Sequence, residues 1–218
     1  MPDVIGLVNE RCVVILSGGM PPFNIKEDDM VICADSGILP FEREERLPDI
    51  LIGDMDSLPD HFIEKMRVKG VKVEKYPEDK DLSDGELAIK RAITFSPDLI
   101  EIYGGKTGRI DHVLSCFHLL HRIPHGIQSV LTLDEDQVIL IREGDTHQGR
   151  TLKSVISVLP AFRKARVTLR GLKWQLEDHP IEIGSTLGIH NEYMGRPFQV
   201  KAESGDIYLI LADEGSPE

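Results

Sequence analysis

The 218-residue sequence lacks the features that mark several common classes of protein. Acidic residues outnumber basic ones by 37 to 25, so the net charge is −12 and there is no basic footprint for general binding to nucleic acid or to an anionic membrane. No apolar run approaches the roughly 18 residues of a membrane span. Residues 1–16 lack a basic stretch followed by a long apolar core, so we expect no signal peptide. These absences predict a cytoplasmic protein that binds neither nucleic acid nor a membrane.

Cysteine is scarce, and two common phosphate-binding motifs are missing. The three cysteines, Cys12, Cys33 and Cys116, are scattered and form no CxxC or Cys/His cluster, which argues against a disulfide framework and a zinc site. The patterns GxxxxGK[ST] and GxGxxG are also absent. The sequence therefore excludes a standard P-loop and a standard dinucleotide-binding loop.

The first part of the chain reads as alternating strands and helices. With 41% hydrophobic residues the chain can build a packed core, and its length fits one large domain or two small ones. Continuous apolar runs, typical of buried parallel strands, predict strands at 12–16, 30–34, 49–52, 99–103 and 127–133. A further, more exposed strand is expected at 71–76, where polar residues alternate with apolar ones. Helical periodicity is expected over 59–69, 83–95 and from about 109 to 122. We predict an α/β domain with an open, mainly parallel sheet and flanking helices.

After about residue 134 the pattern changes to short strands with turns. Strands are expected within 136–143, 151–160, 164–171, 197–203 and 206–212, and no long helical pattern appears there. Alternation of apolar and polar residues indicates sheets with one solvated face. The sequence therefore predicts an α/β domain at residues 1–134, followed by an all-β domain at residues 135–218 that forms a small β-sandwich.

Two acidic clusters, Asp54-Met55-Asp56-Ser57 and the segment 79–84, follow predicted strands. Closely spaced carboxylates repel each other, so a fold rarely gathers them without a balancing cation. Oxygen ligands of this kind suit Mg²⁺. The alternative is that they are solvated loop acids in an acidic protein. Within the second cluster, Ser83 and Glu86 match a capping box, so Ser83 is expected to cap the helix that follows.

The position of these clusters favours a binding site over solvated loops. Ligands of open parallel sheets bind beyond the carboxyl ends of the strands, which is where the chemically distinctive segments fall: 17–19, 35–37, 54–57, 80–84 and 104–112. Glycines there let backbone N–H groups approach phosphate oxygens, and Gly104 and Gly105 precede a helix N-terminus. Arg109 can hold a phosphate bidentately and Lys80 can do so as a point charge. Together these residues predict Mg²⁺-nucleotide chemistry.

Four segments in order, ICADSG, LIGDMDS, KDLSDGELAI and IYGGKTGRIDHVLS, resemble the thiamine pyrophosphokinase family. The resemblance covers the whole N-terminal domain, and SVLP, RGLKWQL and HNE resemble the family's second domain more loosely. It implies transfer of the β,γ-diphosphate of ATP to the hydroxyl of thiamine, giving thiamine diphosphate and AMP, with Mg²⁺ as cofactor. It also implies a homodimer whose sites form between the α/β domain of one chain and the β domain of the other.

The resemblance assigns roles to individual residues. The expected catalytic residues are Asp54, Asp56, Asp81, Asp84 and Arg109, and the expected magnesium ligands among them are Asp54, Asp56 and Asp81. The residues expected to bind the nucleotide are Asp35, Ser36, Gly37, Ser57, Lys80, Gly104, Gly105, Asp111 and His112. Thiamine is expected to contact Trp174, His190 and Asn191. This sequence departs from the family pattern at His190, where Ser is usual, at Ser36, where Gly is usual, and at Ser83, which replaces Thr.

Three alternatives stay open at the level of sequence. The protein could be a related diphosphokinase that acts on a pterin alcohol, because that class shares parts of the acidic pattern. It could also be a non-catalytic sensor of nucleotide or thiamine diphosphate, although a pure binder has less need of so many carboxylates. Trp174, the single tryptophan, could be a packing residue rather than a ring that contacts thiamine.

Overall fold

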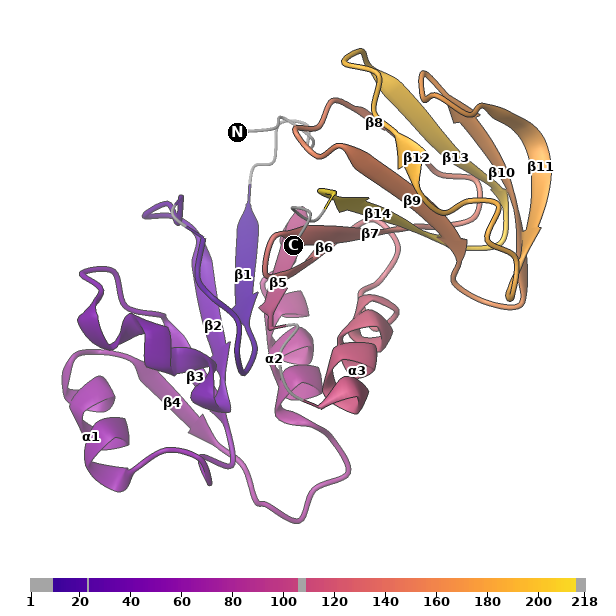
Figure 1. Ribbon diagram of the computed structural model, residues 1–218. Helices are drawn as coiled ribbons and strands as arrows, with labels where there is room; N and C mark the ends of the chain where they lie inside the picture. The colour runs from indigo at the N-terminus through magenta and orange to yellow at the C-terminus, as the bar shows by residue number, and fades with distance from the viewer. Residues whose placement is uncertain (1–9, 23, 106–108, 215–218) are drawn as a thin grey trace. The chain divides into compact units, whose positions relative to one another are not determined.

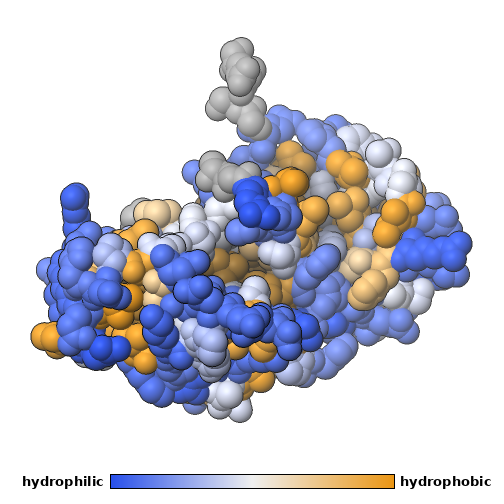
Figure 2. Space-filling view, turned by 90° about the horizontal axis from the view of Figure 1, so that it is seen from below, coloured by the Kyte–Doolittle hydropathy of each residue, from blue (hydrophilic) through white to orange (hydrophobic). Residues whose placement is uncertain are grey.

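The structure is a computed structural model that describes residues 10–22, 24–105 and 109–214. Its described residues form two compact units, which divide in sequence between Asp134 and Glu135. Part of the segment on which the signal-peptide prediction rests, residues 1–9, lies outside the described residues. Among the helices that are described, none is long and apolar enough to cross a membrane. On the face shown in Figure 2, hydrophobic residues appear as separate patches among hydrophilic ones.

The first unit contains a six-strand parallel arrangement (Figure 1), which confirms the predicted fold class. Its strands run in the spatial order β6-β5-β1-β2-β3-β4, and every described pairing among them is parallel. The strands are β1 (Arg11–Ile15), β2 (Met30–Ala34), β3 (Ile50–Gly53), β4 (Lys72–Lys75), β5 (Leu99–Gly104) and β6 (Gln128–Leu133). Strand β1 therefore lies between β2 and β5, where the direction of the strand order reverses.

Among the described residues, three α-helices and one 3₁₀ helix pack on this sheet. They are η1 (Asp35–Arg43), α1 (Asp60–Val68), α2 (Asp84–Ile93) and α3 (Ile110–Leu120). Helix α2 packs on β1, β2 and β3, and α3 contacts β6 and α2. One hydrophobic core joins Val13 and Ile15 of β1 to Phe41 of η1 and Phe62 of α1. The predicted cap of α2 by Ser83 is confirmed, because the N–H of Glu86 donates to Ser83 Oγ at 3.2 Å.

The second unit is a β-sandwich, as predicted. Strands β12, β9, β14 and β7 lie side by side in that order, and β11, β10, β13 and β8 form the other layer with antiparallel pairing. Their bounds are β7 (Asp136–Ile141), β8 (Thr146–Gly149), β9 (Val155–Pro160), β10 (Lys164–Arg170), β11 (Leu176–Glu182), β12 (Asn191–Glu192), β13 (Phe198–Ser204) and β14 (Ile207–Ala212). Buried side chains from both layers, including Val158, Val167, Val200 and Leu209, form one core.

Candidate active site

Three carboxylates meet at the carboxyl end of the parallel sheet. Asp35 directly follows β2, and Asp54 and Asp56 follow β3, the parallel neighbour of β2. Each offers an oxygen, and these oxygens all lie within 4.8 Å of one another. Asp35 Oδ1 is buried and has no hydrogen-bond partner among the described residues. A buried oxygen without a donor is costly unless a cation or water satisfies it, so this carboxylate triad has the character of a cation site.

The backbone around the carboxylate triad is strained. Asp35 and Met55 have φ angles of 45° and 65°, in the left-handed region that residues other than glycine rarely adopt. The Met55 side chain is only 3% exposed and packs in the core of the first unit. Burial of Met55 therefore fixes the turn from which Asp54 and Asp56 project. Strain that surrounding packing maintains is typical of functional sites.

Hydroxyl groups connect the segments that follow β1, β2 and β3 at this edge. Ser57 Oγ donates to Asp35 Oδ2, which ties the segment after β3 to the segment after β2. Ser17 Oγ and Ser36 Oγ are 2.8 Å apart and share a hydrogen bond, which ties the segment after β1 to the same place. The predicted nucleotide-binding residues Ser36 and Ser57 therefore have structural contacts inside the site.

Lys80 lies between two of the predicted catalytic carboxylates. Its Nζ is 2.6 Å from Asp54 Oδ2 and 3.1 Å from Asp84 Oδ1, and its side chain is only 13% exposed. The hydrogen bond from Lys80 lowers the pKa of Asp54 below its ordinary value. Burial alone would lower the pKa of Lys80, but its hydrogen bond with Asp54 and its ion pair with Asp84 outweigh that effect and the pKa is raised. The ammonium group is therefore held charged beside the carboxylate triad.

Asp56 and Asp84 are held in environments that disfavour their charge. Burial is the main cause that raises the pKa of Asp84, and repulsion from Asp54 is the main cause that raises the pKa of Asp56. An added cation would relieve both effects because it favours the ionised form of each group. A raised pKa also makes Asp56 a better proton acceptor than an ordinary aspartate.

Gly53 makes room for Asp84 in this site. Its φ is 146°, and a Cβ at this position would lie 3.0 Å from Asp84 Oδ1 and 3.4 Å from Asp35 Cβ. A side chain at residue 53 would therefore push against two of the acidic residues. Asp84 itself lies in the first turn of α2, which also suits a carboxylate because of the helix dipole.

The glycines after β1, β2 and β5 let three loops approach one another at the point where the strand order reverses. A Cβ on Gly37 would lie 2.3 Å from the carbonyl oxygen of Ile15, and one on Gly105 would lie 2.8 Å from that of Gly18. A Cβ on Gly104 would be 3.2 Å from Leu133 Cδ2. The small residues predicted to approach phosphate are thus also required for close packing of the loops themselves.

Arg109 and Asp111 form an exposed, two-contact ion pair where α3 begins. Arg109 Nε and Nη2 lie 3.1 Å and 2.6 Å from Asp111 Oδ1 and Oδ2. The side chains are 75% and 58% exposed, and the N–H of His112 also donates to Asp111 Oδ1. The pair raises the pKa of Arg109 and lowers that of Asp111. The preceding residues 106–108 lie outside the described part of the chain.

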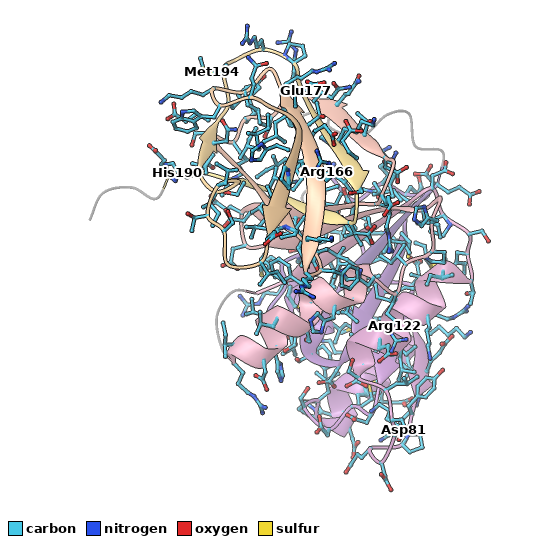
Figure 3. The ribbon with its side chains drawn as sticks, turned by 90° about the vertical axis from the view of Figure 1, so that its right-hand side faces the viewer. Asp81, Arg122, Arg166, Glu177, His190 and Met194 are labelled. Atoms are coloured by element: carbon cyan, nitrogen blue, oxygen red, sulfur yellow. The ribbon has the colours of Figure 1, made fainter. Side chains whose placement is uncertain are left out.

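Asp81 is the predicted ligand that the structure does not bring to the carboxylate triad. It is exposed on the segment between β4 and α2, and Figure 3 shows it at the outer end of that loop. Asp35, which the sequence assigned to nucleotide binding, completes the triad with Asp54 and Asp56. The signal for Asp35 was its position directly after β2, but its meeting with the segment after β3 depends on strand order. Metal ligation by Asp81 stays a prediction.

In the second unit, Asn191 and Trp174 are directly connected. Asn191 Oδ1 accepts hydrogen bonds from the backbone N–H groups of Trp174 and Glu192, at 3.0 Å and 2.9 Å. Asn191 Nδ2 donates to the carbonyl oxygen of Trp174 at 2.6 Å. Asn191 is 5% exposed, whereas Trp174 is 51% exposed. The tryptophan is therefore a displayed ring rather than a core residue, and Asn191 fixes its backbone.

Lys173 covers one face of the Trp174 ring, a contact that sequence analysis missed. Its Nζ lies 4.5 Å from the ring centroid, a cation–π geometry, and it also pairs with Glu192. The adjacency of Lys173 and Trp174 in the sequence was the available signal.

His190 lies next to this group in sequence and has its own contacts. It has a φ of 62°, and its backbone N–H donates to Ser157 Oγ at 3.0 Å. Its Nε2 lies 3.3 Å from Glu214 Oε1 on the surface of the unit, where Figure 3 labels the residue. The imidazole that replaces the family's usual serine is thus an exposed side chain.

The donor set of the carboxylate triad fits a magnesium ion. Each of the three carboxylates offers an oxygen within 4.8 Å of the other two, and Mg²⁺ prefers oxygen ligands. The buried, unpartnered Asp35 Oδ1 is the observation that favours a bound cation over a chance group of acids.

Comparison with known proteins assigns both units to one family. Residues 24–131 match "Thiamin pyrophosphokinase, catalytic domain", and residues 140–207 match "Thiamin pyrophosphokinase, vitamin B1 binding domain". Thiamine pyrophosphokinase of Bacillus subtilis (strain 168) is 28% identical over 195 residues, with 88% of this chain and 83% of the relative covered.

Solved structures share the fold. The crystal structure of thiamine pyrophosphokinase from Bacillus subtilis has a TM-score of 0.80 at 23% identity and covers 94% of this chain and 100% of that one. Thiamin pyrophosphokinase from Candida albicans has a TM-score of 0.77 at 16% identity, with 94% and 90% covered. With both of its units matched, the chain belongs to the thiamin pyrophosphokinase family.

Proposed function

We propose that the protein transfers the β,γ-diphosphate of ATP to the hydroxyl of thiamine. The hydroxyl oxygen forms a bond to the β-phosphorus, the bond from that phosphorus to the bridging oxygen of the α-phosphate breaks, and AMP leaves with that oxygen. Membership of the thiamin pyrophosphokinase family supports the reaction. The observation that carries the chemistry is the carboxylate triad of Asp35, Asp54 and Asp56, with its buried and unpartnered oxygen.

Magnesium dependence is part of this proposal. Asp35, Asp54 and Asp56 would hold the ion, and Lys80 links Asp54 to Asp84 through an ion pair with each. When bound, Mg²⁺ supplies positive charge that neutralises the phosphate oxygens during transfer. The other roles belong to the chain. Lys80 and Arg109 carry positive charge for phosphate oxygens, and the loops with Gly37 and Gly105 present backbone at the sheet edge.

Asp56 is our candidate for the group that accepts the proton of the thiamine hydroxyl. It is the most exposed member of the carboxylate triad, and repulsion from Asp54 raises its pKa. Both properties suit a proton acceptor that must contact a substrate. In the second unit, Trp174 offers an exposed ring on which an aromatic or cationic ring of thiamine can stack.

The family resemblance also supports a homodimer with sites shared between chains and a cytoplasmic location, which we include in the proposal. Sedimentation at micromolar protein concentration tests the dimer. Of the two rival functions, pterin diphosphokinase activity is disfavoured because the second unit matches a vitamin B1 binding domain. A non-catalytic sensor is disfavoured because the predicted carboxylates are present and three of them converge.

Acceptor-dependent release of AMP tests the proposal. The protein is incubated with ATP and Mg²⁺ and with thiamine, with a hydroxymethyl pterin or with no acceptor, and AMP is measured. We expect AMP with thiamine alone and none after chelation of the metal. AMP with the pterin alone would establish the rival kinase, and nucleotide binding without AMP from any acceptor would establish the sensor.

A further inference from the structure

Asp54 is shared between the carboxylate triad and an internal cation. It belongs to the triad with Asp35 and Asp56, and its Oδ2 lies 2.6 Å from Lys80 Nζ. Lys80 also reaches Asp84, and the three side chains are only 13%, 14% and 25% exposed for Lys80, Asp54 and Asp84. An ammonium ion therefore already balances charge beside the place where a metal would bind.

A second cation at this place must compete with the first. Two positive charges a few ångströms apart repel strongly in a partly buried site, where solvent screens them poorly. Lys80 lies on the segment between β4 and α2, and its four-carbon stem can reach another acceptor. A nucleotide phosphate is such an acceptor, because it carries several negatively charged oxygens.

We propose that Lys80 is an exchangeable counter-ion. In the empty enzyme it pairs with Asp54 and Asp84 and weakens the binding of free metal, and when the metal–nucleotide complex binds it transfers its ion pair to a phosphate. Metal and nucleotide then bind more tightly together than separately, and in the empty site Lys80 offsets part of the negative charge of the carboxylates. This inference rests on the proposed function, because it takes the substrate to be a metal–nucleotide complex.

The role differs measurably from that of a lysine that only stabilises the fold. A lysine that only maintains the structure of the site would support the binding of both ligands, so its removal would weaken the binding of metal and of nucleotide. An exchangeable counter-ion opposes one ligand and assists the other. Its removal therefore changes the two affinities in opposite directions, and such couplings are commonly 5- to 150-fold.

The test compares Lys80→Met with the wild type. The probes are Mn²⁺ alone, followed by electron paramagnetic resonance, and ATP in the presence of a chelator, followed by calorimetry. We expect Lys80→Met to bind Mn²⁺ about 5- to 10-fold more tightly and metal-free ATP at least about 5-fold more weakly. Lys65→Met is the matched control, because it removes the same charge from an exposed ion pair with Glu42 in the same unit. Unchanged or weaker Mn²⁺ binding by Lys80→Met would overturn the proposal.

A structure of the wild type with Mn²⁺ and a non-hydrolysable ATP analogue gives a test that needs no variant. We expect Lys80 Nζ within hydrogen-bond distance of a phosphate oxygen and no longer paired with Asp54. An ammonium that stays between Asp54 and Asp84 with metal and nucleotide bound would contradict the exchange. Because neither experiment contains thiamine, their outcome is independent of whether thiamine is the acceptor.

Discussion

The carboxamide of Asn191 is hydrogen-bonded to both the backbone N–H and the backbone carbonyl of Trp174. A third bond, from the N–H of Glu192, leaves the Asn191 side chain little capacity for a ligand. Asn191 therefore acts on a ligand through the tryptophan that it positions, rather than through its own contact.

Asn191→Ala is expected to release the Trp174 backbone. Each buried partner left unpaired costs about 1–3 kcal/mol, so the loop that carries Trp174 should become mobile. Trp174 is the single tryptophan, so its fluorescence reports the change directly. We expect altered emission and a KM for thiamine raised about tenfold or more, with a smaller effect on kcat. Asn191→Asp keeps the two hydrogen bonds that residue 191 accepts and loses the one that it donates, so its emission and its KM for thiamine should lie between those of the wild type and Asn191→Ala. An unchanged emission spectrum in Asn191→Ala would contradict the positioning role.

Gly53→Ala tests the approach of Asp84 to the carboxylate triad. The new Cβ would be strained at a φ of 146° and would lie 3.0 Å from Asp84 Oδ1, so we expect a loss of about 1–3 kcal/mol in stability and weaker binding of Mn²⁺. Gly70→Ala is the matched control, because its φ is 98° but no atom lies within 4 Å of the new Cβ. It should lose stability and keep its metal affinity. Equal metal affinity in both variants would show that Gly53 has no role in the site.

Asp56→Asn separates activity from stability. Asp54 raises the pKa of Asp56, so folding strengthens proton binding at Asp56 and its ionised form destabilises the metal-free fold. That penalty is absent below the ordinary aspartate pKa and is complete above the raised one. We expect Asp56→Asn to melt at a higher temperature than the wild type at pH 7 without metal, and the difference to vanish in acid. AMP formation should be nearly abolished, and a variant with wild-type turnover would remove Asp56 from the mechanism.

Asp35→Asn and Asp81→Asn distinguish the two candidates for the third metal ligand. Asp35 lies in the carboxylate triad with an unpartnered oxygen, whereas Asp81 is exposed and outside it. We expect Asp35→Asn to weaken Mn²⁺ binding in the absence of nucleotide by about tenfold or more, because Asp35 contributes one of the three oxygens of the triad. Asp81→Asn should leave Mn²⁺ affinity within about twofold, because Asp81 lies outside the triad. The reverse ranking would restore the ligand set that the sequence predicts.

Sequence patterns predicted five of the six parallel strands because those strands are largely buried and therefore read as continuous apolar runs. The sixth, β4, is more exposed, and its alternating polar residues were the signal for it. Strands β8, β11 and β12 were missed because each lies at the end of its layer, where burial imposes little pattern. Strand β11 even contains Pro180, which an edge position tolerates because one side of the strand needs no N–H donor. The 3₁₀ helix η1 was also missed, and it contains Pro40, a residue that argues against a helix interior.

The sequence predicted the chemical character of the candidate site, but it did not predict which residues come together in it. That Asp54 and Asp56 gather at a strand end follows from their spacing. That Asp35 joins them depends on β2 and β3 being neighbours, which no local pattern specifies. The pairing of Asn191 with Trp174 likewise joins residues 17 positions apart, through backbone groups that every residue carries.

The most direct test of the account is the fate of the γ-phosphate of ATP. ATP labelled at the γ-phosphorus is incubated with the protein, Mg²⁺ and thiamine, and the products are separated. Transfer of the intact diphosphate predicts labelled thiamine diphosphate and unlabelled AMP in equal amounts. Labelled thiamine monophosphate with ADP, or no thiamine-dependent product at all, would contradict it.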